Sequence, residues 1–297
     1  MTPQDVGAAV SLLRKLEWRL EHAVENHLVG DYRSIFRGRG MEFDQVVRYE
    51  FGDDIRDIDW NVTARLGEPF RKKFVEEREL AVLLVVEDSL SLQFGSGART
   101  KRDGLKELTA LLLVLASLNR DRIGLIHAQP GGFQYTAPVR GRGAIFNAAT
   151  EFLSRPAPDL ADTQPVGIPW DFLPSAVPVN STLVFLGDFP PRAVPVAWPS
   201  LMQRYQTVGF RVDDPWEQAL PDQKPLTVYD PTTNRVVVID PRSKSHRSAH
   251  ASWKAERDEA FAHLFPRQKD RLVVTPDESM TEALVRFFHA HMRRATR

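Results

Sequence analysis

Apolar residues follow three different patterns along the chain. In the first 28 residues, an apolar side chain returns every three or four positions, as in an amphipathic helix. Thr2 and Pro3 are suited to open this helix, and Gly30 is suited to end it. Residues 80–86 are instead a continuous apolar run, which is typical of a strand buried on both faces. Strands and helices are therefore both expected.

From residue 80 onward, strand and helix patterns alternate, which predicts a doubly wound, mainly parallel sheet with helices on both faces. Residues 156–178 contain six prolines and predict an irregular loop, and residues 227–240 predict a hairpin. The predicted strands are 80–86, 122–127, 182–186, 206–212 and 271–274, and the predicted helices are 101–118, 143–153, 249–265 and 279–291.

The first 79 residues do not share this alternation. They contain the N-terminal helix, and then charged and aromatic residues with glycines that indicate turns. Short antiparallel strands are expected near 41–50 and 70–79. We expect residues 1–79 to pack as an extension on an α/β core formed by residues 80–297, the whole being one folding unit.

Composition excludes several kinds of function. The 297 residues include 42% hydrophobic residues, enough for a real core, and 39 basic residues balance 39 acidic ones. No global charge therefore attracts nucleic acid. Because there is no cysteine, the chain has no disulfide, thiolate metal site or cysteine nucleophile. No secretion signal is recognised, and the uncharged stretch 108–118 is too short to cross a bilayer. These features predict a cytoplasmic protein without membrane insertion.

Oxygen-bearing side chains follow the apolar run 80–86 directly. Glu87, Ser89 and Ser91 alternate, and Asp188 comes just after the later strand 182–186. The carboxyl ends of parallel strands share one edge of a sheet, which is where such folds bind ligands. Acids and hydroxyls are also the ligands that Mg²⁺ prefers. The alternative is a strand-to-helix turn without metal, since Ser and Asp also form turns and caps.

Three stretches resemble the von Willebrand factor A-like proteins classed as domain of unknown function 58. The first is residues 38–65, which contain Gly-Asp-Asp-x-Arg-x-Ile-Asp-Trp, followed by residues 74–96. The others are residues 186–192 (LGDFPPR) and the tail from residue 208 (VGFRVDDPWEQALP). The resemblance implies a non-enzymatic interaction or adaptor module. It also implies a partner, a MoxR-type AAA+ ATPase with its client protein, in assembly or maturation.

The resemblance also implies a metal-ion-dependent adhesion site of the pattern Asp-x-Ser-x-Ser, which is degenerate here. Ser89 and Ser91 match, and Asp188 is the expected later acid, but Glu87 replaces the first Asp. The longer Glu would push its carboxylate into the space of the ion. No suitable Thr follows in residues 136–150. We therefore expect Mg²⁺ or Mn²⁺ to bind weakly or not at all.

The charged run 48–65 has two interpretations. Its acids could hold two metal ions for a hydrolase. Its arginines could instead pair with those acids in a structural charge lattice, which we favour because guanidinium groups pair readily with carboxylates. Trp60 is then expected to pack the lattice against the core. The residues concerned are Arg48, Asp53, Asp54, Arg56, Asp57, Asp59, Trp60 and Arg65.

Overall fold

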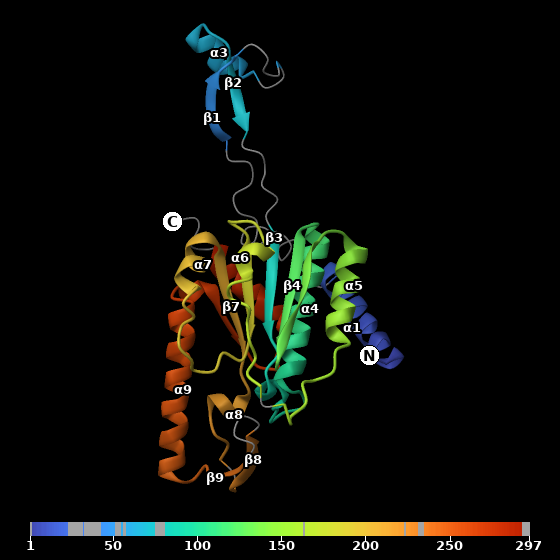
Figure 1. Cartoon of the computed structure of the whole chain (residues 1–297), viewed down its shortest axis with the longest axis vertical. Helices are drawn as coiled ribbons and strands as arrows, with labels where there is room; N and C mark the ends of the chain where they lie inside the picture. Colours follow the sequence, from blue (N-terminus) through green and yellow to red (C-terminus); the bar gives the residue numbers. More distant parts are fainter. Residues whose placement is uncertain are drawn as a thin grey trace.

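A six-stranded sheet forms the centre of the computed structural model (Figure 1). The strand order is β10-β7-β6-β3-β4-β5, and all neighbours are parallel except β4 and β5. The strands are β3 (Ala81–Glu87), β4 (Arg122–Gln129), β5 (Gly132–Val139), β6 (Thr182–Gly187), β7 (Gln206–Val212) and β10 (Arg271–Val274). The structure describes residues 2–22, 32, 43–50, 55, 58–74, 81–162, 164–222, 224–230 and 235–292.

The chain winds away from β3 in both directions, as a doubly wound fold requires. It first runs to β4 and β5 on one side, then returns to β6 on the other side of β3 and continues to β7 and β10. The direction of winding therefore reverses between β3 and β6. The carboxyl ends of strands at such a reversal open a crevice that commonly binds ligands. The predicted fold class is confirmed.

The position of strand β3 between two buried clusters explains its continuous apolar run. Val82, Leu84 and Val86 belong to one buried cluster, and the residues between them belong to a second cluster on the opposite face. Because successive side chains of a strand point to opposite faces, a strand covered on both sides needs apolar residues at every position. The alternation continues beyond Val86. It therefore sends Glu87 and Asp88 to opposite faces of the sheet.

Helices cover both faces. The cluster around Leu84 is closed by α1, α4, α5 and α10, whereas the cluster around Leu83 is closed by α6, α7 and α9. On that second face Gly209 leaves room for the ring of Phe265, since a Cβ atom there would lie 2.3 Å from it. The helices are α1 (Pro3–His22), α4 (Lys101–Asn119), α5 (Arg142–Leu153), α6 (Leu173–Ala176), α7 (Trp198–Arg204), α8 (Pro215–Gln218), α9 (Lys244–Leu264) and α10 (Met280–Met292), with short 3-10 turns at Leu90–Gln93 and Gln268–Asp270.

The N-terminal segment divides into two parts. Helix α1 packs on α4 and α5, and Arg142 pairs with Glu17 at 2.7 Å. Strands β1 (Phe43–Arg48) and β2 (Phe70–Phe74) pair antiparallel beside α3 (Trp60–Leu66), and this unit stands away from the central sheet (Figure 1). The expectation that residues 1–79 form an extension packed on the core stays a prediction for this unit. Helix α3 has no buried residue, and its apolar residues Trp60 and Leu66 are exposed.

Some elements differ from the sequence prediction. Strand β5 is absent from the sequence prediction, although apolar residues alternate along it; it is an antiparallel edge strand without a buried residue, and it contains Pro138. Helix α9 starts at Lys244, five residues before the predicted start, on polar residues that carry no apolar period. The predicted hairpin is present as β8 (Leu226–Asp230) and β9 (Arg235–Ile239). No helix in the described ranges is long and apolar enough to cross a membrane.

Candidate functional site

Three side chains predicted for the cation site come together at the carboxyl edge of the sheet. Ser91 Oγ donates a hydrogen bond to Asp188 Oδ2 at 2.5 Å, and the hydroxyls of Ser89 and Ser91 lie 2.8 Å apart. Strand β3 is parallel to both β4 and β6, so these residues share one edge as predicted. After Asp188 the backbone of Phe189 adopts φ +49°, and this left-handed turn carries the chain away from the edge.

Asp188 is already bound by two cations. Lys101 Nζ lies 2.8 Å from Asp188 Oδ1, and Arg257 Nη2 lies 2.5 Å from the same oxygen. The Arg257 guanidinium also donates to the backbone carbonyl oxygen of Asp188. Burial by itself would raise the pKa of Asp188, but the two cations outweigh burial and hold this pKa at about 2. Asp188 is therefore an ionised carboxylate at neutral pH.

Lys101 is the more deeply buried of the two cations, with 1% of its surface exposed. Its ammonium group also donates to Glu217 Oε1, from helix α8, at 2.6 Å. Burial lowers the pKa of Lys101, but Asp188 and Glu217 outweigh burial, and the pKa is raised above its ordinary value. Lys101 is the first residue of α4, which Thr100 caps through a capping box with Asp103. It is therefore held charged at a fixed place.

Glu87, the unusual first residue of the predicted metal motif, faces a different partner. Arg192, in the loop after β6, donates to both of its carboxylate oxygens at 2.7 and 2.6 Å. A Cβ atom at Gly187 would lie 3.1 Å from the Glu87 Cβ atom, so the glycine leaves room for this side chain. Such a two-pronged pair is strong and directional. The pair with Arg192 therefore engages both oxygens of the Glu87 carboxylate.

Asp88 points to the other face of the sheet, as strand alternation requires. Arg102 Nε and Nη2 donate to its carboxylate at 2.9 and 2.8 Å, and His127 Nε2 lies 2.9 Å from Asp88 Oδ2. Burial would raise the pKa of Asp88, but His127 and Arg102 outweigh burial and lower it. Burial lowers the pKa of His127 despite this acid. This buried cluster stabilises the turn after β3.

Two further acids lie at the end of β7 and were missed by the sequence argument. Asp213 contacts Arg211 at 2.9 Å and Arg257 at 3.0 Å. Asp214 caps α8 and accepts hydrogen bonds from Ser96 N at 2.7 Å and Ser96 Oγ at 2.6 Å. The rule applied to Asp188 also identifies these residues, because they too follow a buried strand. The edge is thus a network of acids and cations from three strands.

The groups present do not fit a divalent metal ion. Glu87 is paired with Arg192, and Asp188 is paired with Lys101 and Arg257. Within the described ranges, no three Asp, Glu or His side chains are arranged to hold a metal. A metal ion would have to approach two fixed positive charges. The four predicted residues Glu87, Ser89, Ser91 and Asp188 therefore form a hydrogen-bonded and ion-paired edge.

Only part of the charge lattice predicted at 48–65 lies within the described residues. Arg48 pairs with Glu68 at 2.5 Å on the surface, and the Asp59 carboxylate caps α3 by accepting from the backbone N–H groups of Asn61 and Val62. Trp60 exposes 67% of its surface, so the expectation that it packs against the core is wrong. Arg65 is exposed on α3. Asp53, Asp54, Arg56 and Asp57 lie outside the described residues.

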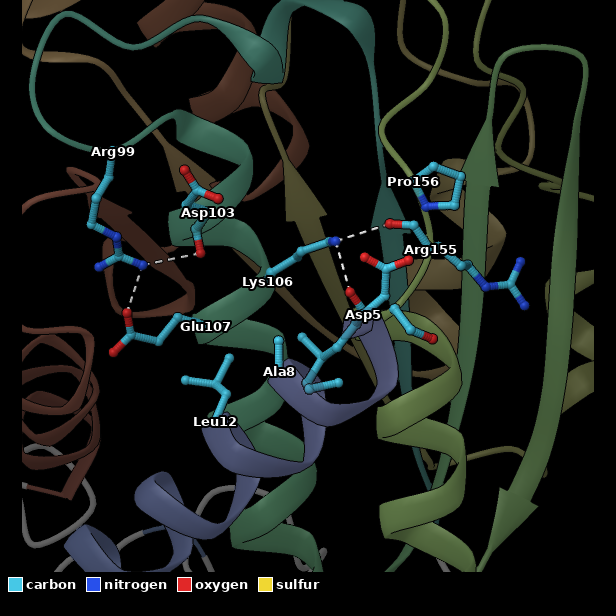
Figure 2. A pocket seen from close by; sticks show the side chains of 12 residues that line it. Asp5, Ala8, Leu12, Arg99, Asp103, Lys106, Glu107, Arg155 and Pro156 are labelled. Carbon is cyan, nitrogen blue, oxygen red and sulfur yellow. Dashed lines mark hydrogen bonds and ion pairs between the residues drawn. The ribbon is translucent and has the colours of Figure 1, made fainter. Parts of the chain in front are cut away.

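A surface hollow of about 410 Å³ lies between α1, α4 and the end of α5 (Figure 2). Lys106 points across it and donates to the carbonyl oxygens of Leu153 and Arg155 at 2.8 and 3.0 Å. Arg99 donates to the Asp103 carbonyl oxygen and pairs with Glu107 (Figure 2). Lys106 thus satisfies carbonyl groups at the end of α5, as cations commonly do at helix C-termini. We assign the hollow a structural role.

Lys106 makes stability depend on pH in the alkaline range. Burial lowers its pKa to about 8 from an ordinary 10.5, so the unfolded chain binds more protons between these values. Stability is expected to rise as pH increases from about 8 to about 10.5. In Lys106→Met this rise should be smaller. Chemical unfolding midpoints at pH 7.5 and 10 measure the difference, and the same pH dependence in both proteins would contradict it.

Comparison with known proteins places the chain in a family. The family model described as "Protein of unknown function DUF58" matches residues 45–260. The uncharacterized proteins Mb1516 of Mycobacterium bovis and Rv1480 of Mycobacterium tuberculosis are each 28% identical over 236 residues, which is 77% of this chain and 73% of theirs.

Two solved structures are similar to the chain at lower sequence identity. The conserved hypothetical protein BatB from Bacteroides thetaiotaomicron has a TM-score of 0.43 at 14% identity and covers 72% of this chain and 99% of its own. The pilus adhesin SpaC from Lactobacillus rhamnosus GG has a TM-score of 0.41 at 10% identity, over 74% of this chain and 30% of its own. The family match spans well over half of the sequence, and the chain therefore belongs to the DUF58 family of proteins of unknown function.

Proposed function

We propose that this chain is a non-enzymatic protein-interaction module that binds a protein partner at the carboxyl edge of its sheet. The observation that carries the proposal is a partly exposed aromatic pair at this edge, Phe94 and Trp216, with ring centroids 6.2 Å apart. Trp and Arg are the residues most often found at the energetic centres of protein interfaces. We call Ser89, Ser91, Phe94, Arg192 and Trp216 together the carboxyl-edge surface.

The carboxyl-edge surface is fixed before any partner arrives. Asp214 joins its two aromatic segments, since it accepts from the backbone N–H groups of Ser96 at 2.7 Å and Trp216 at 2.8 Å. Glu87 fixes Arg192 through two hydrogen bonds. A surface that is already ordered loses less conformational entropy on binding. This rigidity is typical of a surface that recognises a partner, and it differs from the mobility of a catalytic loop.

The buried acids of the edge support a non-enzymatic role. A catalytic carboxylate must reach a substrate, a water molecule or a metal ion. Asp188, Asp88 and Asp213 are instead each paired with arginine or lysine. The alternative, a metal-dependent hydrolase that uses the Asp53–Asp59 carboxylates, is not favoured. Asp59, the member of that cluster within the described residues, accepts hydrogen bonds as the cap of α3.

The nature of the partner rests on the family resemblance. A MoxR-type AAA+ ATPase, acting with a client protein in assembly or maturation, is the partner that we propose. The absence of cysteine fits a reducing compartment, and a cytoplasmic location is part of the same proposal. The von Willebrand A-like interpretation agrees with the six-stranded, mainly parallel sheet.

Truncating the aromatic pair is expected to weaken partner binding by at least about 10-fold, because interface tryptophans commonly contribute more than 1.4 kcal/mol. The variants are Phe94→Ala and Trp216→Ala, titrated against a purified MoxR-type ATPase from the same genome. Trp18→Ala, on the exposed side of α1, is the control and should bind as the parent does. Equal affinity of all four proteins, or metal-dependent hydrolase activity in the parent, would overturn the proposal.

A further inference from the structure

The position of Lys101 is unfavourable by the ordinary rules of helix electrostatics. The N-terminus of a helix carries a partial positive charge and favours anions. Lys101 is nevertheless the first residue of α4, a helix of 19 residues, and its charge is almost fully removed from water. A buried ammonium group is costly unless acids and hydrogen bonds surround it. The positive charge of Lys101 must therefore contribute an interaction that an apolar residue at this position would not provide.

The groups around Lys101 are those that a hard cation attracts. Its ammonium contacts one carboxylate oxygen of Asp188 at 2.8 Å and one of Glu217 at 2.6 Å. The other oxygen of Asp188 accepts from Ser91, whose hydroxyl in turn lies 2.8 Å from that of Ser89. Two carboxylates from separate segments thus meet at the Lys101 ammonium group, and two hydroxyls are linked to one of these carboxylates. Mg²⁺ and Mn²⁺ use the same oxygen ligands.

We propose that Lys101 is a resident cation, which holds this oxygen cluster together in place of a divalent metal ion. An ammonium group has three N–H donors and needs no ion from solution. The carboxyl edge therefore keeps its geometry at any concentration of divalent metal. This inference goes beyond the proposed interaction and does not depend on it, since it concerns the folded chain alone.

Arg257 does not replace Lys101 in this role. Its guanidinium is shared between Asp188, Asp213 and Glu217, with contacts of 2.5, 3.0 and 3.1 Å. When Lys101 is removed, the cluster therefore keeps more acid than cation around the vacated space. Asp188 Oδ1 and Glu217 Oε1, the two oxygens that Lys101 contacts, then remain as possible metal ligands, with the Ser91 hydroxyl bonded to the other oxygen of Asp188. A metal ion can enter there, whereas in the parent it meets the Lys101 ammonium group.

Removing Lys101 should create a response to divalent metal that the parent lacks. In Lys101→Ala we expect the melting temperature to rise by roughly 2 °C for each tenfold increase of Mn²⁺ or Mg²⁺ above the Kd. The parent should shift by less than about 1 °C over the same titration. Binding of Mn²⁺ is measured in parallel by its electron paramagnetic resonance signal. If Lys101→Ala does not fold, Lys101→Met, which keeps most of the side-chain length without the charge, is measured instead.

Two further variants decide what the response means. Lys106→Ala is the matched control, because Lys106 is on the same helix but donates only to carbonyl oxygens. It should show no metal response. Adding Asp188→Asn to Lys101→Ala should abolish the gain. The inference is overturned if the parent binds Mn²⁺ as tightly as Lys101→Ala does, or if the Lys101 variants respond no more than Lys106→Ala.

Discussion

Asp188→Ala is expected to lower the free energy of unfolding by about 3–5 kcal/mol, the usual cost of removing one partner from a buried ion pair. The reason is that Lys101 and Arg257 remain buried after the carboxylate is lost. Glu217 and Asp213 still contact these cations, but they are already shared among the same groups. The chain would then carry excess positive charge at the N-terminus of α4, where the helix itself opposes it.

Equilibrium unfolding in guanidinium chloride measures this loss. Glu151→Ala is the matched control, because the Arg155–Glu151 pair has a similar distance of 2.5 Å but lies on the surface. Surface pairs contribute about 0–1 kcal/mol, so this control should be nearly as stable as the parent. Similar losses from Asp188→Ala and Glu151→Ala would show that the network at the edge does not stabilise the fold.

The lowered pKa of Asp188 also predicts how the stability of the protein changes in acid. Its pKa is about 2 in the folded state and ordinarily 3.8, so the folded carboxylate is favoured over the unfolded one. Its contribution of about 2 kcal/mol is complete above about pH 4 and is lost as pH falls toward 2. This part of the acid dependence should be missing in Asp188→Ala. Unfolding midpoints measured from pH 5 to pH 2 test the difference.

Asp88→Ala is expected to have a similarly large effect on the other face of the sheet, again about 3–5 kcal/mol. In the parent, the Arg102 guanidinium donates to Asp88 through both Nε and Nη2. The change leaves it buried with two backbone carbonyl oxygens as its remaining partners. It also removes the acid that contacts His127. The turn after β3 would lose the group that fixes it to α4.

A second substitution tests whether pairing is the cause. If the loss comes from an unpaired Arg102, adding Arg102→Met to Asp88→Ala should cost less than the sum of the two single changes. The conservative variant Asp88→Asn gives an independent measurement by nuclear magnetic resonance. The carboxylate raises the pKa of His127 against burial, so this pKa should fall further in Asp88→Asn. Simple additivity together with an unchanged His127 pKa would contradict the assignment.

The sequence by itself determined the architecture. A run of apolar residues at every position of 81–86 requires a strand covered on both faces, and the alternation of strands and helices then leaves few topologies. The same rules placed Ser89, Ser91 and Asp188 at one edge. These conclusions were reached because strand alternation and parallel crossovers follow from local backbone geometry.

The tertiary structure alone decided what those side chains do. Lys101 is 87 residues from Asp188, Arg192 is 105 residues from Glu87, and Arg257 is 69 residues from Asp188. No periodicity specifies which helix terminus or loop meets a given strand end, because that depends on how the helices pack on the sheet. The exposure of Trp60 was likewise misjudged, since whether α3 packs on the core is set by tertiary contacts. A hydrophobic pattern specifies which faces are buried, whereas the pairing of buried charges depends on distances of a few ångströms between distant segments.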